Sequence, residues 1–235
     1  MNTFLKFTLN LFTFLFMAVP LSSIVYAEDL STKTITTPAF TLISLETVGD
    51  LIVENGTTHI ITIEAEPKVL AVMTAKVEGN VLRIFSNGSF STQKPINLKV
   101  KLAKLNGVSS DSSGDILIGK WKTDKLDLSV LSSGSIKASE VNADKIKLLI
   151  EGAGDIGLAG HTQNLQVKLE GSGTIDANKL IANTAVASIE GSGDINLNVT
   201  NTLNASISGS GTISYFGNPK LTSSIEGAGD IVKRD

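Results

Sequence analysis

The sequence contains no cysteine and few aromatic side chains. Without cysteine the chain has no disulfide bonds and no thiolate ligands for zinc, so its stability depends on its own core. Aromatic residues amount to 5% of the 235 residues, which leaves few rings to stack on sugars. The 20 basic and 23 acidic side chains give a net charge of −3. This balance argues against nucleic acid as a partner, because nucleic-acid binding needs a basic face.

Groups that carry out chemistry are also scarce. The two histidines, His59 and His161, fall in an alternating segment and in a polar turn. A metal site would need both of them together with carboxylates, and solvated side chains are the simpler interpretation. The sequence has no G-x-S-x-G nucleophile motif, and its two arginines are Arg83 and Arg234. We therefore predict a protein that is not an enzyme and that has no catalytic residues, cofactor or metal.

The first 27 residues have the organisation of a secretory signal peptide. Lys6 supplies a positive charge, residues 7–19 are almost wholly apolar, and Val25 to Ala27 match a small-x-small cleavage pattern. Pro20 ends the apolar run short of the roughly 20 residues that span a bilayer, although an uncleaved membrane anchor is an alternative. No later segment is apolar enough to span a membrane. We predict cleavage after Ala27 and export to the periplasm, the cell surface or the medium.

From Asp111 onward the sequence repeats a short glycine signature. The pattern G/S-S/A-G-x-I recurs seven times, at intervals of 18 to 20 residues. A period of this size is typical of a solenoid, in which each unit stacks on the one before it. The second glycine of each copy marks the repeat, at Gly114, Gly134, Gly154, Gly173, Gly193, Gly211 and Gly229.

Apolar and polar residues alternate before each signature, as in a strand with one buried face. Aligned copies give three apolar columns, whose members we expect to stack at the strand spacing of about 4.8 Å. The columns are Leu126, Ile146, Leu165, Ala185, Leu203 and Leu221; Val130, Ile150, Leu169, Ile189, Ile207 and Ile225; and Ile116, Ile136, Ile156, Ile175, Ile195, Ile213 and Ile231.

Glycine inside a strand is explained by a sharp bend or a close backbone approach, so we interpret each G-x-G as the corner of a coil. Leucine-rich repeats, which alternate strands and helices, have a similar period. The residues between the last isoleucine of one signature and the first apolar column of the next copy are too few for a helix with two loops. The prediction for residues 109–235 is an all-β parallel β-helix, or β-solenoid, of about seven coils of roughly 20 residues.

Residues 28–108 are less regular and are predicted to form an N-terminal β region or cap that continues into the solenoid. Gly79-Asn80 and Asn55-Gly56 are expected to be hairpin turns. Gly49, Asp50 and Leu51 resemble a degenerate (worn) copy of the repeat signature. Strands are expected at residues 39–45, 51–53, 59–65, 70–77, 81–85 and 96–102.

Acidic side chains stand at matching positions beside the signatures. Glu151, Glu170 and Glu190 precede the first glycine in three successive copies, while acids and hydroxyls alternate after the second glycine, with Asp155 and Asp194 among the acids. Like charges about 4.8 Å apart repel by roughly 0.9 kcal/mol in water. The column after the second glycine avoids most of this repulsion because a hydroxyl separates its acids, whereas the glutamate column has no such separation. These five residues are the candidate interaction stripe. Calcium or a basic partner would offset the repulsion, and a solvated face without a ligand is the alternative that we favour.

Residues 207–219 carry the motif G-S-G-x-I-x-Y-x-G-x-P, which closes the repeat array. With the preceding repeats and the signal sequence, this motif resembles the family described as "putative auto-transporter adhesin, head GIN domain", over about residues 39–232. The resemblance implies a β-helical fold, a surface or periplasmic location and an adhesin role, and the family has no assigned catalytic residues. The implied partner is a surface or envelope component, glycan or protein.

Two other functions remain open on the sequence alone. Polysaccharide lyases and hydrolases also use β-helices, so a glycan-processing enzyme is an alternative, although it would need acids or bases that converge on one groove. A structural envelope protein that self-associates through a solenoid end is another. The sequence leaves the ligand and the oligomeric state open.

Export is directly testable. When the full chain is produced in a bacterium, N-terminal sequencing of periplasmic or extracellular material should begin at Glu28, because a signal peptidase removes the residues before it. Membrane-bound protein that retains Met1 would show instead that the segment is an anchor.

Overall fold

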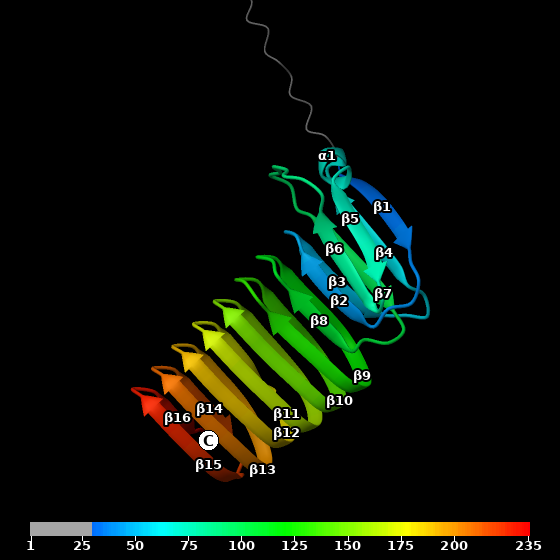
Figure 1. Cartoon of the computed structure of the whole chain (residues 1–235). Helices are drawn as coiled ribbons and strands as arrows, with labels where there is room; N and C mark the ends of the chain where they lie inside the picture. Colours follow the sequence, from blue (N-terminus) through cyan, green and yellow to red (C-terminus); the bar gives the residue numbers. More distant parts are fainter. Residues whose placement is uncertain (1–29) are drawn as a thin grey trace, which may run out of the picture.

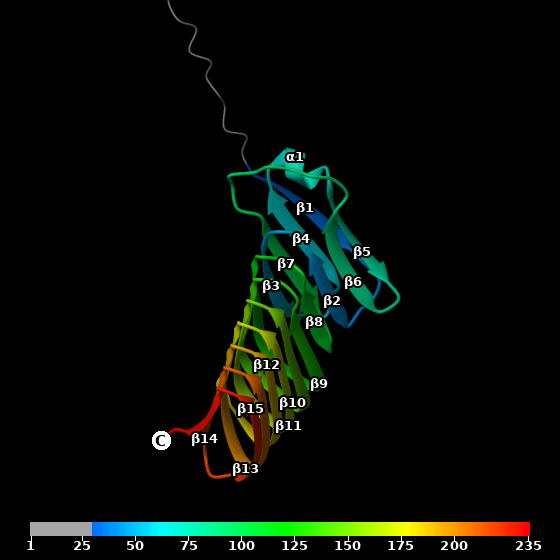
Figure 2. The same cartoon turned by 60° about the vertical axis from the view of Figure 1, so that its left-hand side comes forward.

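The computed structural model describes residues 30–235, and the signal peptide predicted at residues 1–27 lies outside them. Strands joined in one 16-stranded sheet wind around a continuous core (Figures 1 and 2). In the described part of the chain, the helix α1 (Pro67–Leu70) is short and no helix is long and apolar enough to cross a membrane.

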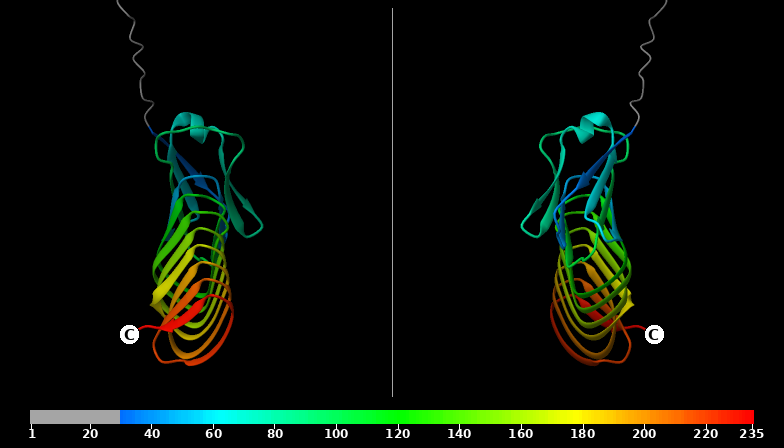
Figure 3. Two further views of the ribbon diagram at one scale, coloured as in Figure 1. Left: turned by 90° about the vertical axis from the view of Figure 1, so that its left-hand side faces the viewer. Right: turned by 90° about the vertical axis from the view of Figure 1, so that its right-hand side faces the viewer.

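The predicted β-solenoid is confirmed. Long strands pair in parallel, each with the next along almost its whole length, so that the coils stack as rungs (Figure 3). The seven corners that carry the glycine signature enclose about six turns, close to the predicted count. The strands are β9 (Asp115–Val130), β10 (Ser135–Gly152), β11 (Asp155–Gly171), β12 (Thr174–Gly191), β13 (Asp194–Gly209), β14 (Thr212–Phe216), β15 (Lys220–Gly227) and β16 (Asp230–Lys233).

Bends inside each long strand divide a coil into three walls. In β10, buried and solvent-facing side chains alternate as far as Ile150 except at residues 139–140 and 144–145, where two neighbouring residues are both exposed. In a regular strand one member of each pair would point into the core. Both point to solvent, so the chain bends at these pairs. We call residues 135–138 of this coil the first wall, 141–143 the middle wall and 146–150 the third wall. The G-x-G corner then leads into the next coil.

The predicted apolar columns form the core of the solenoid. Ile156 is the register partner of both Ile136 and Ile175, and the column is fully buried from Ile116 to Ile213. The columns that begin at Leu126 and Val130 pair in the same way. Branched side chains suit this arrangement because they pack well on a pleated surface.

The corner glycines allow the coils to approach one another closely. A Cβ added at Gly173 would lie 2.0 Å from the carbonyl oxygen of Gly154, and this backbone atom has no room to move aside. The glycine before it in the same corner, Gly171, has a φ of +132°, which L side chains rarely adopt. A sharp bend and a close approach together therefore explain the G-x-G signature.

Two sheet extensions cover the N-terminal end of the solenoid. From the first wall of β9 the order is β3, β7, β4 and β1, and from the third wall it is β8, β2, β6 and β5. α1 lies across the top, with Val69 buried (Figure 1). The bounds are β1 (Ser31–Thr36), β2 (Leu42–Glu46), β3 (Asp50–Asn55), β4 (Ile60–Ala65), β5 (Met73–Glu78), β6 (Val81–Ser86), β7 (Asn97–Leu102) and β8 (Gly107–Ser110).

The worn copy of the repeat is confirmed, since Leu51 is the register partner of Ile116. The turn at residues 79–80 joins the antiparallel strands β5 and β6, as expected. The hairpin expected at Asn55-Gly56 is wrong. β7 lies between β3 and β4, and the Gly56 N–H donates to the carbonyl of Leu102 at 2.9 Å.

Two other expectations about strands of the N-terminal region need correction. The strand expected from residue 70 begins at Met73, because Pro67 favours the first turn of a helix and α1 occupies residues 67–70. β1 and β8 were not predicted. Residue 108, the predicted boundary, falls inside β8, which pairs with both β2 and β9 in one continuous sheet.

Two glycine-to-alanine changes test the close approach at the corners. Gly173→Ala should lower the free energy of unfolding by about 3 kcal/mol or more, because the new methyl group meets backbone. At Gly157 the nearest atom to an added Cβ is Cγ of Lys137 at 3.7 Å, so Gly157→Ala should change stability by less than about 0.5 kcal/mol. Urea denaturation measures both, and equal effects would refute a steric role for Gly173.

Candidate functional site

The five acidic residues of the predicted stripe lie on either side of one edge of the solenoid. Glu151, Glu170 and Glu190 end the third wall and are in direct register on three rungs. Asp155 and Asp194 begin the first wall, after the G-x-G corner has turned the chain. The structure therefore brings the five residues to a common edge but not onto one flat face.

A lysine already offsets part of the glutamate column. The Nζ atom of Lys168 pairs with the carboxylate of Glu170 and, at 3.4 Å, with that of Glu190. Its hydrogen bond to Glu170 is the main cause that raises the pKa of Lys168, against a smaller opposing effect of desolvation. The compensating cation, which the sequence analysis sought in a ligand or partner, thus comes from the chain. The column analysis missed Lys168 because it stands two residues before Glu170 on the same strand.

The aspartate column joins neighbouring coils. An Oδ1 atom of Asp155 accepts a hydrogen bond from the backbone N–H of Thr174 on the next rung, at 3.0 Å. Asp115 accepts one from the hydroxyl of Ser135 at 2.6 Å. The alternation of acid and hydroxyl therefore supplies hydrogen bonds between rungs. Across residues 30–235, no group of three or more His, Cys, Asp and Glu side chains is placed to hold a metal ion.

A shallow groove crosses three rungs of the middle wall, and we call it the polar groove. Three of its lining residues are register partners: Lys122 on β9, Asn142 on β10 and His161 on β11. Its volume is about 520 Å³. The other lining residues are Thr123, Asp124, Ala143, Asp144, Thr162 and Gln163.

Local backbone geometry positions the rungs of the polar groove. Gly160, just before His161, has a φ of +135°, and a Cβ there would lie 1.9 Å from the carbonyl oxygen of Val141. Glycine is therefore needed for β11 to follow β10 around this bend. The hydroxyl of buried Thr162 donates within the wall, to the carbonyls of Asp144 at 3.3 Å and Asn164 at 3.2 Å.

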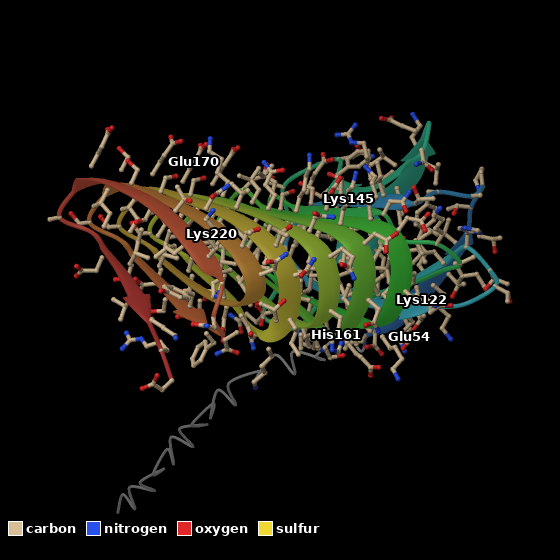
Figure 4. All side chains as sticks on the ribbon, turned by 90° about the horizontal axis from the view of Figure 1, so that it is seen from below. Glu54, Lys122, Lys145, His161, Glu170 and Lys220 are labelled. Atoms are coloured by element: carbon tan, nitrogen blue, oxygen red, sulfur yellow. The ribbon has the colours of Figure 1, made fainter. Side chains whose placement is uncertain are left out.

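The polar groove presents ammonium, imidazole, amide and carboxylate groups within a short span. Lys122 and His161 lie at the same edge of the solenoid in Figure 4, whereas Glu170 lies at the opposite edge. The sequence analysis took His161 for a solvated turn residue and did not single out Lys122 or Asn142. Alignment of the copies beyond the apolar columns would have found these two, because they stand equally far along the chain from Gly114 and Gly134.

The first wall carries a second groove, of about 630 Å³, that is more apolar. Ile52 and Leu117, neighbours on successive rungs, are 41% and 48% exposed. Lys137 occupies the next rung of this column, followed by Gly157 and Asp176. The apolar part is therefore short along the solenoid axis, and single exposed apolar side chains are normal on protein surfaces.

The shifted carboxylates of the cap belong to ion pairs. Arg83 holds Glu46 through two hydrogen bonds, of 2.9 and 2.6 Å, and Glu78 through a third of 3.2 Å. The hydrogen bonds from Arg83 are the main cause that lowers the pKa of Glu46. Glu54 has a lowered pKa chiefly through its hydrogen bond from Lys99. These groups are held as anions and support the cap.

The glutamate column allows a matched test of repulsion. Glu151 has no ion-pair partner among the described residues, so Glu151→Gln should remove its repulsion with Glu170 and raise the melting temperature at low salt by about 1 °C. Glu170→Gln also removes a partner of Lys168 and should leave the melting temperature unchanged or lower it. Thermal melts at two ionic strengths measure this difference, which should fade as salt screens the charges.

Calcium added in the same melts should not change the melting temperature of the unchanged protein or of its variants. A cation that bound only the folded state would raise the melting temperature by mass action. A calcium-dependent rise that disappeared in the triple variant Glu151→Gln, Glu170→Gln, Glu190→Gln would contradict a merely solvated edge.

Comparisons with solved structures agree with the fold. A "putative adhesin" from Bacteroides fragilis is 28% identical, with a TM-score of 0.82 over 88% of this chain and 98% of that one. A "putative lipid binding protein" from Parabacteroides distasonis and a "putative adhesin" from Parabacteroides merdae are each 21% identical. Both have a TM-score of 0.72 and cover 89% of this chain and 98% of their own, which shows a common fold.

Sequence comparison identifies the family. No functionally curated protein matches the chain. The family model described as "Putative auto-transporter adhesin, head GIN domain" matches residues 39–219, which include most of the cap and most of the solenoid. The chain therefore belongs to this head GIN domain family, as the motif that closes its repeat array predicted.

Proposed function

We propose that this chain is an exported, non-catalytic module that binds a glycan against the middle wall of its solenoid, at the cell surface or in the envelope. The observation that carries the proposal is the polar groove, in which Lys122, Asn142 and His161 stand side by side on three rungs. The rungs are parts of one paired sheet, so the backbone positions of these three residues are fixed before a ligand binds.

The chemistry of the groove suits a hydroxyl-rich ligand. Strand spacing places successive side chains about 4.8 Å apart, which gives a row of donors and acceptors along the solenoid axis. Lys122 lies beside Asp124 and Asp144 in the lining, so that neither sign of charge dominates. A neutral or weakly charged glycan chain that runs along the axis fits such a row better than a strongly charged polymer does.

The acidic groups of the cap do not suit proton donation. A glycosidase needs one carboxylic acid whose pKa is raised, so that it donates a proton to the leaving group. The carboxylates of Glu46, Glu54, Glu66 and Glu78 in the cap have lowered pKa values because they accept hydrogen bonds, which is the opposite of what a proton donor needs. The predicted signal peptide and membership of an adhesin family support export and a surface role.

A glycan array tests the proposal. Labelled mature chain should bind a subset of immobilised bacterial and host polysaccharides, and the variant Lys122→Ala, Asn142→Ala, His161→Ala should lose at least about tenfold in apparent affinity, roughly 1.4 kcal/mol. The matched control replaces Lys147, Gln166 and Asn204 with alanine on the third wall, and it should bind as the unchanged protein does.

Two results would overturn the proposal. The mature chain would bind no immobilised glycan, or the third-wall control would lose binding as much as the groove variant. Release of new reducing ends from a bound polysaccharide would favour the glycan-processing alternative over a binding module.

A further inference from the structure

The two ends of the solenoid differ. At the N-terminal end, strands of the cap and α1 cover the core, and Val69 and Phe40 are buried. At the other end, every residue of β15 is exposed, and β15 pairs with β13 on one side only among the described strands. Figures 1 and 2 show this last rung at the end of the stack opposite the cap.

The apolar columns continue into this open end. Leu221 is 37% exposed and Ile225 is 45% exposed, whereas Leu203 and Ile207, their partners one rung earlier, are buried. Core side chains and a free strand edge are therefore presented together. Such an edge is a template for pairing with another strand.

The backbone of β15 offers free hydrogen-bonding groups at alternate residues. Asp127 on β9 stands in the same column as Thr222, several rungs earlier. Its N–H donates to the carbonyl oxygen of Asn106 on the preceding coil, at 2.9 Å, so the backbone groups at this column point to the preceding coil. Successive residues of a strand turn these groups to opposite sides. The N–H and C=O groups of Leu221, Ser223 and Ile225 consequently point to the free edge.

The sequence of β15 is complementary to itself when read antiparallel about Ser223. In that register Leu221 lies opposite Ile225 of the second strand, and both continue the core face. Lys220 lies opposite Glu226 on the outer face, which gives two opposite-charge pairs per dimer. Directly opposed side chains of an antiparallel pair share a face and interact, so both sets of contacts form at once.

We propose that two copies of this chain associate end to end, with β15 of one copy paired antiparallel to β15 of the other about Ser223. The arrangement has two-fold symmetry, so it closes as a dimer and covers both free edges. Head-to-tail stacking is disfavoured because the cap covers the other end of the core. The proposal does not depend on glycan binding, although a dimer would carry two polar grooves.

Charge reversal tests the proposed register in the mature chain. Sedimentation velocity over about 1 to 100 µM should show a monomer–dimer equilibrium. Lys220→Glu and Glu226→Lys should each raise the dimer Kd at least about tenfold, because like charges then face each other. The double variant should restore dimerisation, and a mixture of the two single variants should form a heterodimer tighter than either homodimer.

Ser223→Pro supplies an independent test of backbone pairing. The Ser223 N–H faces the free edge, so proline there removes no hydrogen bond within the monomer but blocks the strand-to-strand ladder. Dimerisation should be lost while the urea midpoint of the diluted monomer stays unchanged.

Three outcomes would refute the dimer. The mature chain would remain monomeric throughout the concentration range, the charge variants would associate as the unchanged protein does, or larger assemblies would form in place of a dimer. None of these results affects glycan binding by the middle wall, which the array measures separately.

Discussion

The contact between successive corner glycines constrains the whole molecule. At each corner the carbonyl oxygen of one coil lies where a side chain of the next would begin, as Gly154 and Gly173 show. This contact sets the stacking of every rung, because a coil that starts in one place must follow the coil before it. The apolar columns are the consequence. Ile156 meets Ile175 because their corners are already aligned.

The same stacking organises the outer surface into columns. Some columns serve the solenoid itself: Asp155 holds the backbone of Thr174, and Lys168 spans Glu170 and Glu190. The middle wall is different, since Lys122 and His161 have no ion pair among the described residues and line an open groove. A rigid scaffold that presents a row of polar side chains without ion-pair partners is the physical basis for the surface-binding role that we propose.

The ends of the stack complete this division of roles. The cap shows how the chain closes a solenoid, with antiparallel strands that turn away from the parallel ladder and a short helix over the core. The last rung lacks such a cover within the described residues, and its exposed Leu221 and Ile225 belong to the core columns. Linking two such modules raises overall affinity for a repetitive surface without any new contact in the groove. Pairing at the open end would therefore determine how many polar grooves one assembly presents.

Local pattern was enough to predict the solenoid, its apolar columns and its corner glycines, because strand alternation and backbone clearance act over a few residues and repeat at each coil. The family followed from the motif that closes the array. Tertiary structure alone decided the insertion of β7 between β3 and β4, the reach of Lys168 to the next rung and the opening of the polar groove. Each of these depends on where a strand bends and on which wall a side chain then stands. A repeat period specifies which residues share a column, but the path of the folded chain specifies which columns meet.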